Sequence, residues 1–180
     1  MKLKSKKAPL FLAQAALVAA MYAVLTLAQQ LILPNTASMA VQYRLSEALM
    51  VLCLFSKAAV PGLTLGCFLA NFLFMQVLPV DMVFGSVATL LAAVCMWKLR
   101  NVKVRKFPLL SFLMPAVFNG IIIGAEIEIF FVDGAFHFSS FLVQALLVFL
   151  GEFAVMFTAG IALYFPLRKK LSKIEGFSVL

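Results

Sequence analysis

The stretch APLFLAQAALVAAMYAVLTLAQQLIL, residues 8–33, carries no charged side chain and is almost entirely apolar. A helix needs about 20 apolar residues to cross the roughly 30 Å hydrocarbon core of a bilayer, so this stretch is long enough to cross with some tilt. It is also far longer than the apolar core of a secretory signal, which runs to about 7–15 residues. We therefore expect a membrane-spanning helix here that is not cleaved off.

Five further apolar runs follow. Of the 180 residues, 64% are hydrophobic and only 12% are charged, whereas soluble domains are about half apolar and a quarter charged. Open strands cannot satisfy their backbone hydrogen bonds in lipid, so the runs are expected to be helices. The sequence predicts an all-α integral membrane protein, one domain over residues 1–180. The predicted helices are at about 8–33, 42–56, 59–78, 80–98, 108–131 and 138–166.

The basic residues test the number of spans, because Lys and Arg collect in short loops on the cytoplasmic side. With six spans and a cytoplasmic N-terminus, that side receives both tails, Lys57 and the cluster Lys98–Lys106, and only Arg44 lies outside. If the short run 42–56 did not cross, the cluster and the C-terminal tail would both lie outside. We therefore predict a multi-pass cell-membrane protein with both termini in the cytoplasm. Its second helix crosses obliquely or lies partly in a protein-lined cavity.

Topology also accounts for the net charge of +8. Binding to nucleic acid strands would need a basic face interleaved with aromatic side chains, and no such pattern is present. Nucleic acid is therefore not an expected partner.

Most acidic side chains lie in or beside the predicted spans, where a charge costs roughly 2.5–3.5 kcal/mol on insertion scales. Such residues usually face a cavity or a partner, so they are candidates for ligand binding. Arg44 and Glu47 are three residues apart and share a helix face, so they could pair with each other, contact a ligand, or do both. Asp81 lies at the outer end of the fourth helix.

The fifth and sixth helices carry the other acidic candidates. Asn119 and Glu126 are seven residues apart and share a face, while Glu128 points to a nearly opposite side and is expected to be structural or interfacial. Glu152 lies near the middle of the sixth helix, where the alternatives to ligand binding are an interhelical hydrogen bond or a protonated carboxyl group. An interhelical hydrogen bond is also the alternative for Asn71.

Small residues form a stripe on the first helix, at Ala15, Ala19 and Ala23. Spacings of four place them on one face, where small side chains let two helices approach closely in lipid. The stripe is either a packing seam within the chain or a docking surface for another membrane subunit.

No assembled catalytic or metal-binding set is visible. The cysteines, Cys53, Cys67 and Cys95, lie in apolar runs without a C-x-x-C pair, and His137 is the single histidine, so we expect the cysteines to pack as small hydrophobes and no metal to bind. Phosphate-loop, H-E-x-x-H and G-x-S-x-G motifs are absent. We expect no cofactor and no enzymatic activity. An intramembrane enzyme using Glu126, Glu128 and His137 is disfavoured, because the two glutamates point to different sides of their helix and His137 is expected in an outer loop.

A series of short motifs is distributed along the chain. They are Gln42-Tyr43-Arg44-Leu45-Ser46-Glu47-Ala48-Leu49, Pro61-Gly62-Leu63 with Gly66 and Asn71, Asp81-Met82-Val83-Phe84-Gly85-Ser86 with Ala88-Thr89-Leu90, Phe118-Asn119-Gly120 with Gly124 and Glu126, and Gly151-Glu152. Their order and spacing resemble the substrate-binding (S) components of energy-coupling factor transporters, which are bacterial importers. More narrowly, nearly the whole chain is similar to the family assigned to uptake of queuosine precursors.

The resemblance implies an S-component-like bundle that captures a small molecule from outside. A separate transmembrane coupling subunit and two ATPase subunits would drive its release inside. In related S components an alanine stripe on the first helix meets the coupling subunit, and the matching positions here are Ala15, Ala19 and Ala23.

The implied ligand is a deazaguanine such as the aminomethyl form. Its ring presents an N–H and an amino group side by side, and a carboxylate can accept both. A cationic aminomethyl group would favour a second carboxylate. Glu126 and Glu152 are expected to supply the two carboxylates, with Asn119 at the carbonyl edge of the ring. The remaining substrate-binding candidates are Arg44, Glu47, Asn71 and Asp81.

Two other functions stay open. An S component for a different vitamin would keep the architecture and change the ligand. A stand-alone proton-coupled carrier would use Glu126 or Glu152 as its proton site, although many carriers are built from inverted repeats and none is visible here.

Overall fold

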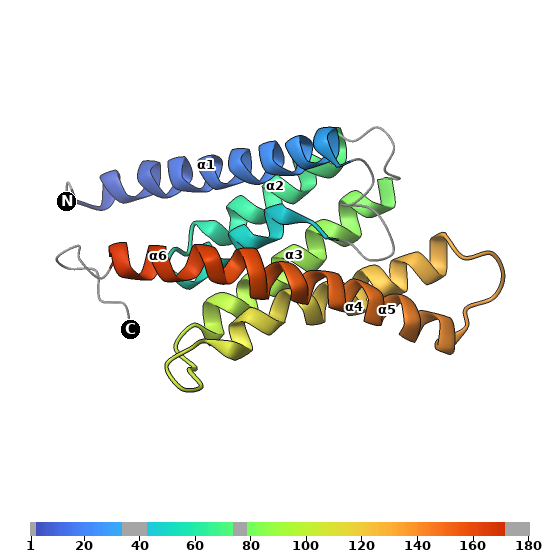
Figure 1. Ribbon diagram of the computed structural model, residues 1–180. Coiled ribbons are helices and arrows are strands. Elements are labelled where there is room, and N and C mark those ends of the chain that lie inside the picture. The colour runs from blue at the N-terminus through green and yellow to red at the C-terminus, as the bar shows by residue number, and fades with distance from the viewer. Residues whose placement is uncertain (1–2, 34–42, 74–78, 172–180) are drawn as a thin grey trace.

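The computed structural model describes residues 3–33, 43–73 and 79–171 (Figure 1). Across these ranges the chain is helical and forms no β-sheet, which confirms the all-α prediction. Its elements are α1 (Leu3–Ile32), the 3₁₀ helix η1 (Leu45–Leu54), α2 (Ala59–Leu73), α3 (Pro79–Leu99), α4 (Leu109–Phe130), and a long C-terminal helix made of α5 (Phe138–Val155), a π-helical turn η2 (Met156–Gly160) and α6 (Ile161–Leu171).

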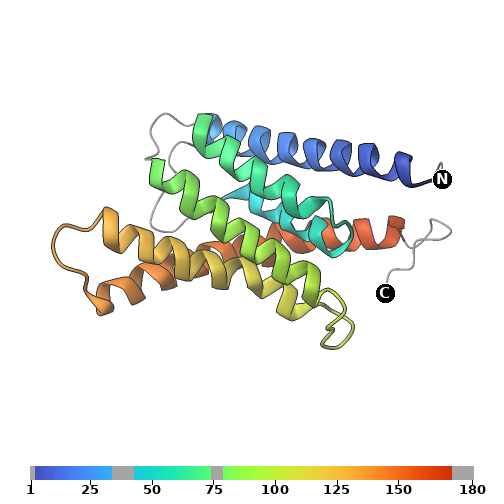
Figure 2. The ribbon, with the colours of Figure 1, turned by 180° about the vertical axis from the view of Figure 1, so that it is seen from behind.

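Successive segments run in opposite directions, as the two opposite views show (Figures 1 and 2). The start of α1 and the end of α6 therefore lie at the same end of the bundle. The turn containing Lys57, the α3–α4 connection with its lysines and arginines, and Arg168–Lys170 all lie at this end. We call it the basic end, and the opposite one the far end. The alternation matches the six predicted runs and their charge pattern.

Within the described residues, four segments are long and apolar enough to cross a membrane: Ala8–Ile32, Pro79–Leu99, Leu109–Phe130 and Phe138–Leu171. Two segments, η1 and α2, are shorter. The predicted second helix is a 3₁₀ helix of ten residues, which at about 2.0 Å per residue covers roughly 20 Å. Residue 42 and residues 74–78, which were predicted to extend these two helices, lie outside the described residues.

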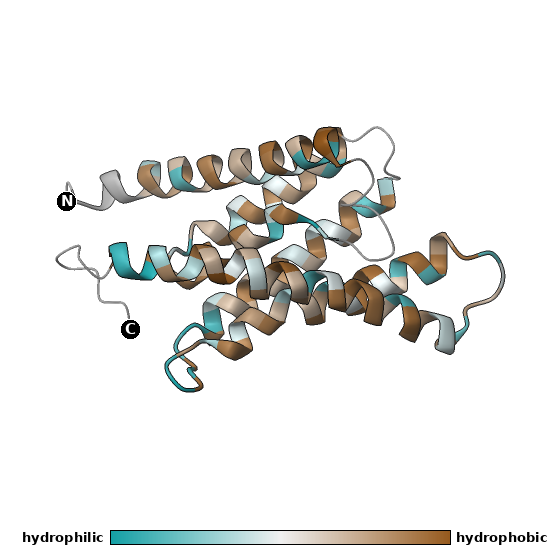
Figure 3. Cartoon of the chain, in the orientation of Figure 1, coloured by the Kyte–Doolittle hydropathy of each residue, from teal (hydrophilic) through white to brown (hydrophobic). Residues whose placement is uncertain are grey.

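The η1 helix is the central element of the bundle, since it contacts every helix from α1 to α6 and η2 as well. Its residues 46–51 are buried. Of the two alternatives given for the short second helix, an oblique crossing or a position partly inside the protein, this burial favours the second. Hydrophobic side chains cover much of the outer surface instead, and hydrophilic ones gather at the α3–α4 connection and the end of α6 (Figure 3).

Two pairs of glycines bring neighbouring helices into backbone contact. A Cβ added at Gly62 or Gly66 on α2 would lie 2.7 Å from an atom of α1. A Cβ added at Gly124 on α4 would lie 2.6 Å from the Cα of Ala145 on α5, and one at Gly120 would lie 3.0 Å from the Ala145 carbonyl oxygen. Such close packing is how helices associate in lipid, where the hydrophobic effect does not drive them together.

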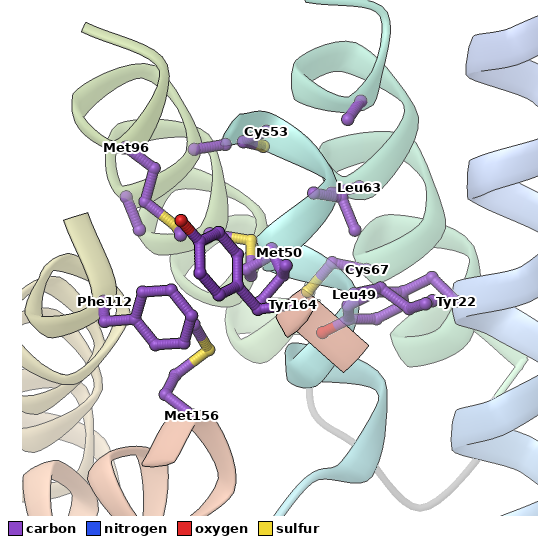
Figure 4. Packing of buried hydrophobic residues seen from close by; sticks show 14 of the residues in the cluster. Tyr22, Leu49, Met50, Cys53, Leu63, Cys67, Met96, Phe112, Met156 and Tyr164 are labelled. Atoms are coloured by element: carbon purple, nitrogen blue, oxygen red, sulfur yellow. The ribbon is translucent and has the colours of Figure 1, made fainter. Parts of the chain in front are cut away.

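The apolar core fills the half of the bundle toward the basic end. Figure 4 shows Met50, Met96, Phe112, Met156 and Tyr164 converging from η1, α3, α4, η2 and α6. All five are 3% exposed or less. This half of the interior is therefore sealed by large apolar side chains.

Candidate functional site

A polar stripe on α1 holds the beginning of η1. Tyr22, Thr26 and Gln29 follow at spacings of four and three, so they share one helix face. The Tyr22 hydroxyl donates a hydrogen bond to Glu47 Oε1. The Thr26 hydroxyl bonds the Ser46 hydroxyl at 2.7 Å. All five side chains are buried.

Gln29 clamps the backbone just before η1. Its Nε2 donates to the Tyr43 carbonyl oxygen at 2.5 Å, and its Oε1 accepts from the Leu45 N–H at 2.8 Å. These bonds fix the backbone on either side of Arg44. The sequence-based prediction missed this stripe, although three polar residues at helical spacing in an apolar run were a usable signal.

Arg44 is the cationic group of the site. Its Nη1 lies 3.7 Å from Cys67 Sγ on α2, at the distance of a weak hydrogen bond to sulfur. Its guanidinium group also interacts electrostatically with Glu47, Glu126 and Glu152. Arg44 precedes η1 in an extended backbone conformation, so it does not share a helix face with Glu47 as their spacing had predicted. Both side chains belong to a larger charged group. Cys67 is part of this group and does not only fill space.

The other acidic candidates come from α3, α4 and α5. The Glu152 carboxyl group accepts a hydrogen bond from Asn119 and interacts electrostatically with Glu47. The Glu126 carboxyl group lies beside that of Asp81. The structure therefore brings the predicted ligand-binding residues of α3, α4, α5 and η1 into one polar group, in which Asp81 is half-buried and the other acidic side chains are buried.

Several carboxylate oxygens in this group lack a hydrogen bond of normal geometry within the described residues: Glu47 Oε2, Glu152 Oε2 and both oxygens of Glu126. These three side chains are 1–2% exposed. A buried polar group without a partner is costly, and a buried charge more so. Together with Asp81, the group sets four acidic side chains against one arginine. It is suited to a ligand that brings N–H donors and positive charge.

Asn71 lies beside this group and has a structural contact. Its Nδ2 donates to the Asp81 carbonyl oxygen at 3.1 Å, and it lies 3.9 Å from Cys67 Sγ. It thereby ties α2 to the first turn of α3. The interhelical hydrogen bond that the sequence left open as its alternative role is present.

Glu128 is separate from the polar group. Its Oε1 accepts a hydrogen bond at 3.0 Å from the backbone N–H of His137, the residue that precedes α5. This bond satisfies one of the free donors near a helix start. Its contact is structural, as its direction on α4 predicted.

The alanine stripe of α1 lies in a seam within the chain. Ala19 and Ala23 are buried, and the carbonyl oxygens of Ala15 and Ala19 face Gly62 and Gly66 of α2. This is the packing alternative considered for the stripe. Exposed small residues of α1 lie next to the stripe, at Ala16 and Ala20, and two residues before it, at Ala13.

The polar group occupies the half of the bundle toward the far end. Asp81 lies in the first turn of α3, Asn119 at the middle of α4 and Glu126 in the second half of α4, whereas the apolar core holds the opposite parts of these helices. In Figure 4, Tyr22 and Cys67 lie at the edge of that core. Among the described residues, no three His, Cys, Asp or Glu side chains are grouped to hold a metal ion.

The helical bundle is closed by apolar side chains toward one end and holds an acid-rich group in its interior toward the other. This arrangement is typical of a membrane protein that binds a small polar solute. The chain belongs to the QueT transporter family, whose model matches residues 12–169. The protein is thus a membrane transporter. Neither the curated proteins nor the solved structures include a match to it.

Proposed function

We propose that this chain is the S component of an energy-coupling factor importer and that it binds a deazaguanine precursor of queuosine, preferentially the aminomethyl form. The observation that carries the proposal is the set of buried carboxylate oxygens that lack a hydrogen bond of normal geometry among the described residues, in a chain of the QueT transporter family. A ligand with several N–H donors and a positive charge would satisfy them. A deazaguanine with an aminomethyl substituent has both properties.

The division of the interior supports capture from one side. The binding group lies toward the far end, and the basic end is closed by the apolar core. Basic loops collect in the cytoplasm, so we place the basic end and both termini there. The ligand then enters from outside, and its release inside requires the sealed half to open.

That requirement is the reason to propose partner subunits. The chain has no phosphate-loop motif, so the energy for release would come from two ATPase subunits acting through a transmembrane coupling subunit. The coupling subunit would pack on α1. Ala15 and Ala19 face α2, and Ala19 and Ala23 are buried, so contact through Ala15, Ala19 and Ala23 would require α1 to shift, whereas Ala13, Ala16 and Ala20 are exposed now.

The first test is a titration of the purified chain in detergent with the aminomethyl and cyano deazaguanines and with queuine. Tight binding of one of them, with the amine preferred, supports the proposal. A folded protein that binds none of them overturns it. A thermal-shift panel of vitamins then tests an S component with another ligand, because a specific ligand raises the melting temperature by mass action.

One observation favours a second candidate, a stand-alone proton-coupled carrier. Glu126 lies beside Asp81, and neither of its oxygens has a hydrogen bond of normal geometry within the described part of the chain. Paired acids in a membrane are common in proton relays. Uptake by the chain alone in proteoliposomes, driven by a pH gradient, would establish this function. An S component would show no such uptake without its partner subunits.

A further inference from the structure

Gln144 on α5 is a polar residue that the site described so far does not use. Its side-chain carbonyl oxygen Oε1 is buried and has no hydrogen-bond partner within the described part of the chain. Gln144, Val148 and Glu152 follow one another at spacings of four, so they lie on one face of α5. Val148 is fully buried and Glu152 is 2% exposed, so this face is turned to the interior.

The contact between α4 and α5 fixes the depth of Gln144. A Cβ at Gly124 would meet the backbone of Ala145, and one at Gly120 would meet the Ala145 carbonyl oxygen and Phe149. The two helices are antiparallel, so Gln144 lies at about the level of Glu126, while Glu152 lies at the level of Asn119. The Glu152–Asn119 hydrogen bond agrees with this register.

An apolar layer separates these two levels. Ala88, Ile123 and Val148 form a small buried cluster between α3, α4 and α5. On α4 the order along one face is Asn119, Ile123, Glu126, and on α5 it is Glu152, Val148, Gln144. Each helix thus presents a polar, an apolar and a second polar position in register with the other.

We propose that Gln144, Asp81 and Glu126 form a subsite for a primary ammonium group, separated by this apolar layer from the subsite in which Glu152 and Asn119 bind the edge of the ring. A primary ammonium group has three N–H donors, and the outer level offers three acceptor groups. This proposal rests on the proposed function and specifies the orientation of the ligand within the site.

The dimensions and chemistry of the two levels agree with one ligand spanning both. Asn119 and Glu126 are seven residues apart, which is about 10 Å along a helix. A fused two-ring base with a one-carbon substituent and a hydrogen bond at each end has about this length. Asn119 can donate to a ring carbonyl while Glu152 accepts from the neighbouring N–H and amino groups. The amine would then point toward the far end.

The test compares two ligands that share a ring, the aminomethyl deazaguanine and its cyano analogue, which lacks the ammonium group. The full chain in lipid nanodiscs is titrated with each as wild type, Gln144→Leu and Gln144→Glu. We expect Gln144→Leu to weaken amine binding about tenfold or more, since hydrogen bonds to charged groups are strong, and to leave cyano binding unchanged within about twofold. Gln144→Glu keeps an acceptor and should retain amine binding.

Gln14→Leu is the matched control, because Gln14 is an exposed residue on α1. Gln144→Met, which also lacks the carbonyl group, repeats the measurement with an unbranched side chain, so that a folding defect in one variant does not decide the result. If Gln144→Leu changes neither affinity, or weakens both equally, the ammonium subsite is overturned while the proposed function stands. If the wild-type protein binds neither ligand, the proposed function itself is overturned.

Discussion

The hydroxyl group of Tyr22 on α1 donates a hydrogen bond to Glu47 in the first turn of η1, and both side chains are buried. This bond ties the central 3₁₀ helix to the outer helix α1 at the level of the polar group. Because Glu47 Oε2 has no hydrogen-bond partner within the described residues, the Tyr22 bond is a main source of stabilisation for this carboxylate.

Replacing Tyr22 with Phe should therefore destabilise the protein. The change removes the donor and leaves a buried carboxylate oxygen unpaired, which we expect to lower the free energy of unfolding by roughly 1–2 kcal/mol. Unfolding in mixed detergent, followed by circular dichroism, measures the effect. Tyr164→Phe, a change within the apolar core, is the matched control. Equal effects of the two substitutions would contradict the role given to Tyr22.

The α4–α5 seam leads to a second prediction. In Gly124→Ala the new Cβ would lie 2.6 Å from the Ala145 Cα, so α5 must move away from α4. We expect a loss of about 1–3 kcal/mol in stability, as for other overpacked interiors, and weaker ligand binding because α5 carries Glu152. At Gly160 the nearest atoms to an added Cβ are 3.5 Å away, so Gly160→Ala is the tolerated control in the same unfolding and titration experiments.

The helical segments could be predicted from hydropathy because long apolar runs have few alternatives in lipid. The 3₁₀ form of η1 could not, since the mostly apolar residues 45–54 would also suit a short membrane-spanning helix. A position in the protein interior could be given only as one of two alternatives. The run is well below the roughly 20 residues that a membrane-spanning helix needs, and this short length was the feature of the sequence that argued against an ordinary span.

The site was predictable only in part. Charged residues in apolar runs, such as Glu126 and Glu152, are conspicuous, and the structure brings them together with Arg44 and Glu47. Tyr22 and Cys67 are common in apolar helices and gave no signal alone. The alanine stripe shows the limit of periodicity, because spacing identifies a shared face but not which neighbour covers it.

Two buried cysteines in different surroundings provide a third prediction. Both belong to the apolar core cluster, but Cys67 Sγ also lies within hydrogen-bonding distance of Arg44 and Asn71. Cys67→Ser offers these donors a stronger acceptor and should leave stability nearly unchanged. Cys53→Ser buries a hydroxyl group among apolar side chains and should cost about 1–3 kcal/mol. Thermal unfolding of both variants in the same detergent compares them, and a reversed order would contradict the placement of Cys67 in the polar group.

The acidic site itself should lower the stability of the ligand-free protein. Both oxygens of Glu126 are buried without a hydrogen bond of normal geometry in the described residues, and the neighbouring side chain is that of Asp81, another acid. Binding sites often retain such unfavourable groups because a ligand satisfies them. Glu126→Gln replaces the acid with a neutral group of the same shape, so we expect a higher melting temperature without ligand and binding of the aminomethyl deazaguanine weakened about tenfold or more.

Glu128→Gln is the matched control, because Glu128 accepts a backbone hydrogen bond from His137 and should gain no stability from the change. A Glu126→Gln protein that is less stable than wild type would mean that the carboxylate is held by favourable contacts of its own, and its role in attracting a cationic ligand would then have to be abandoned.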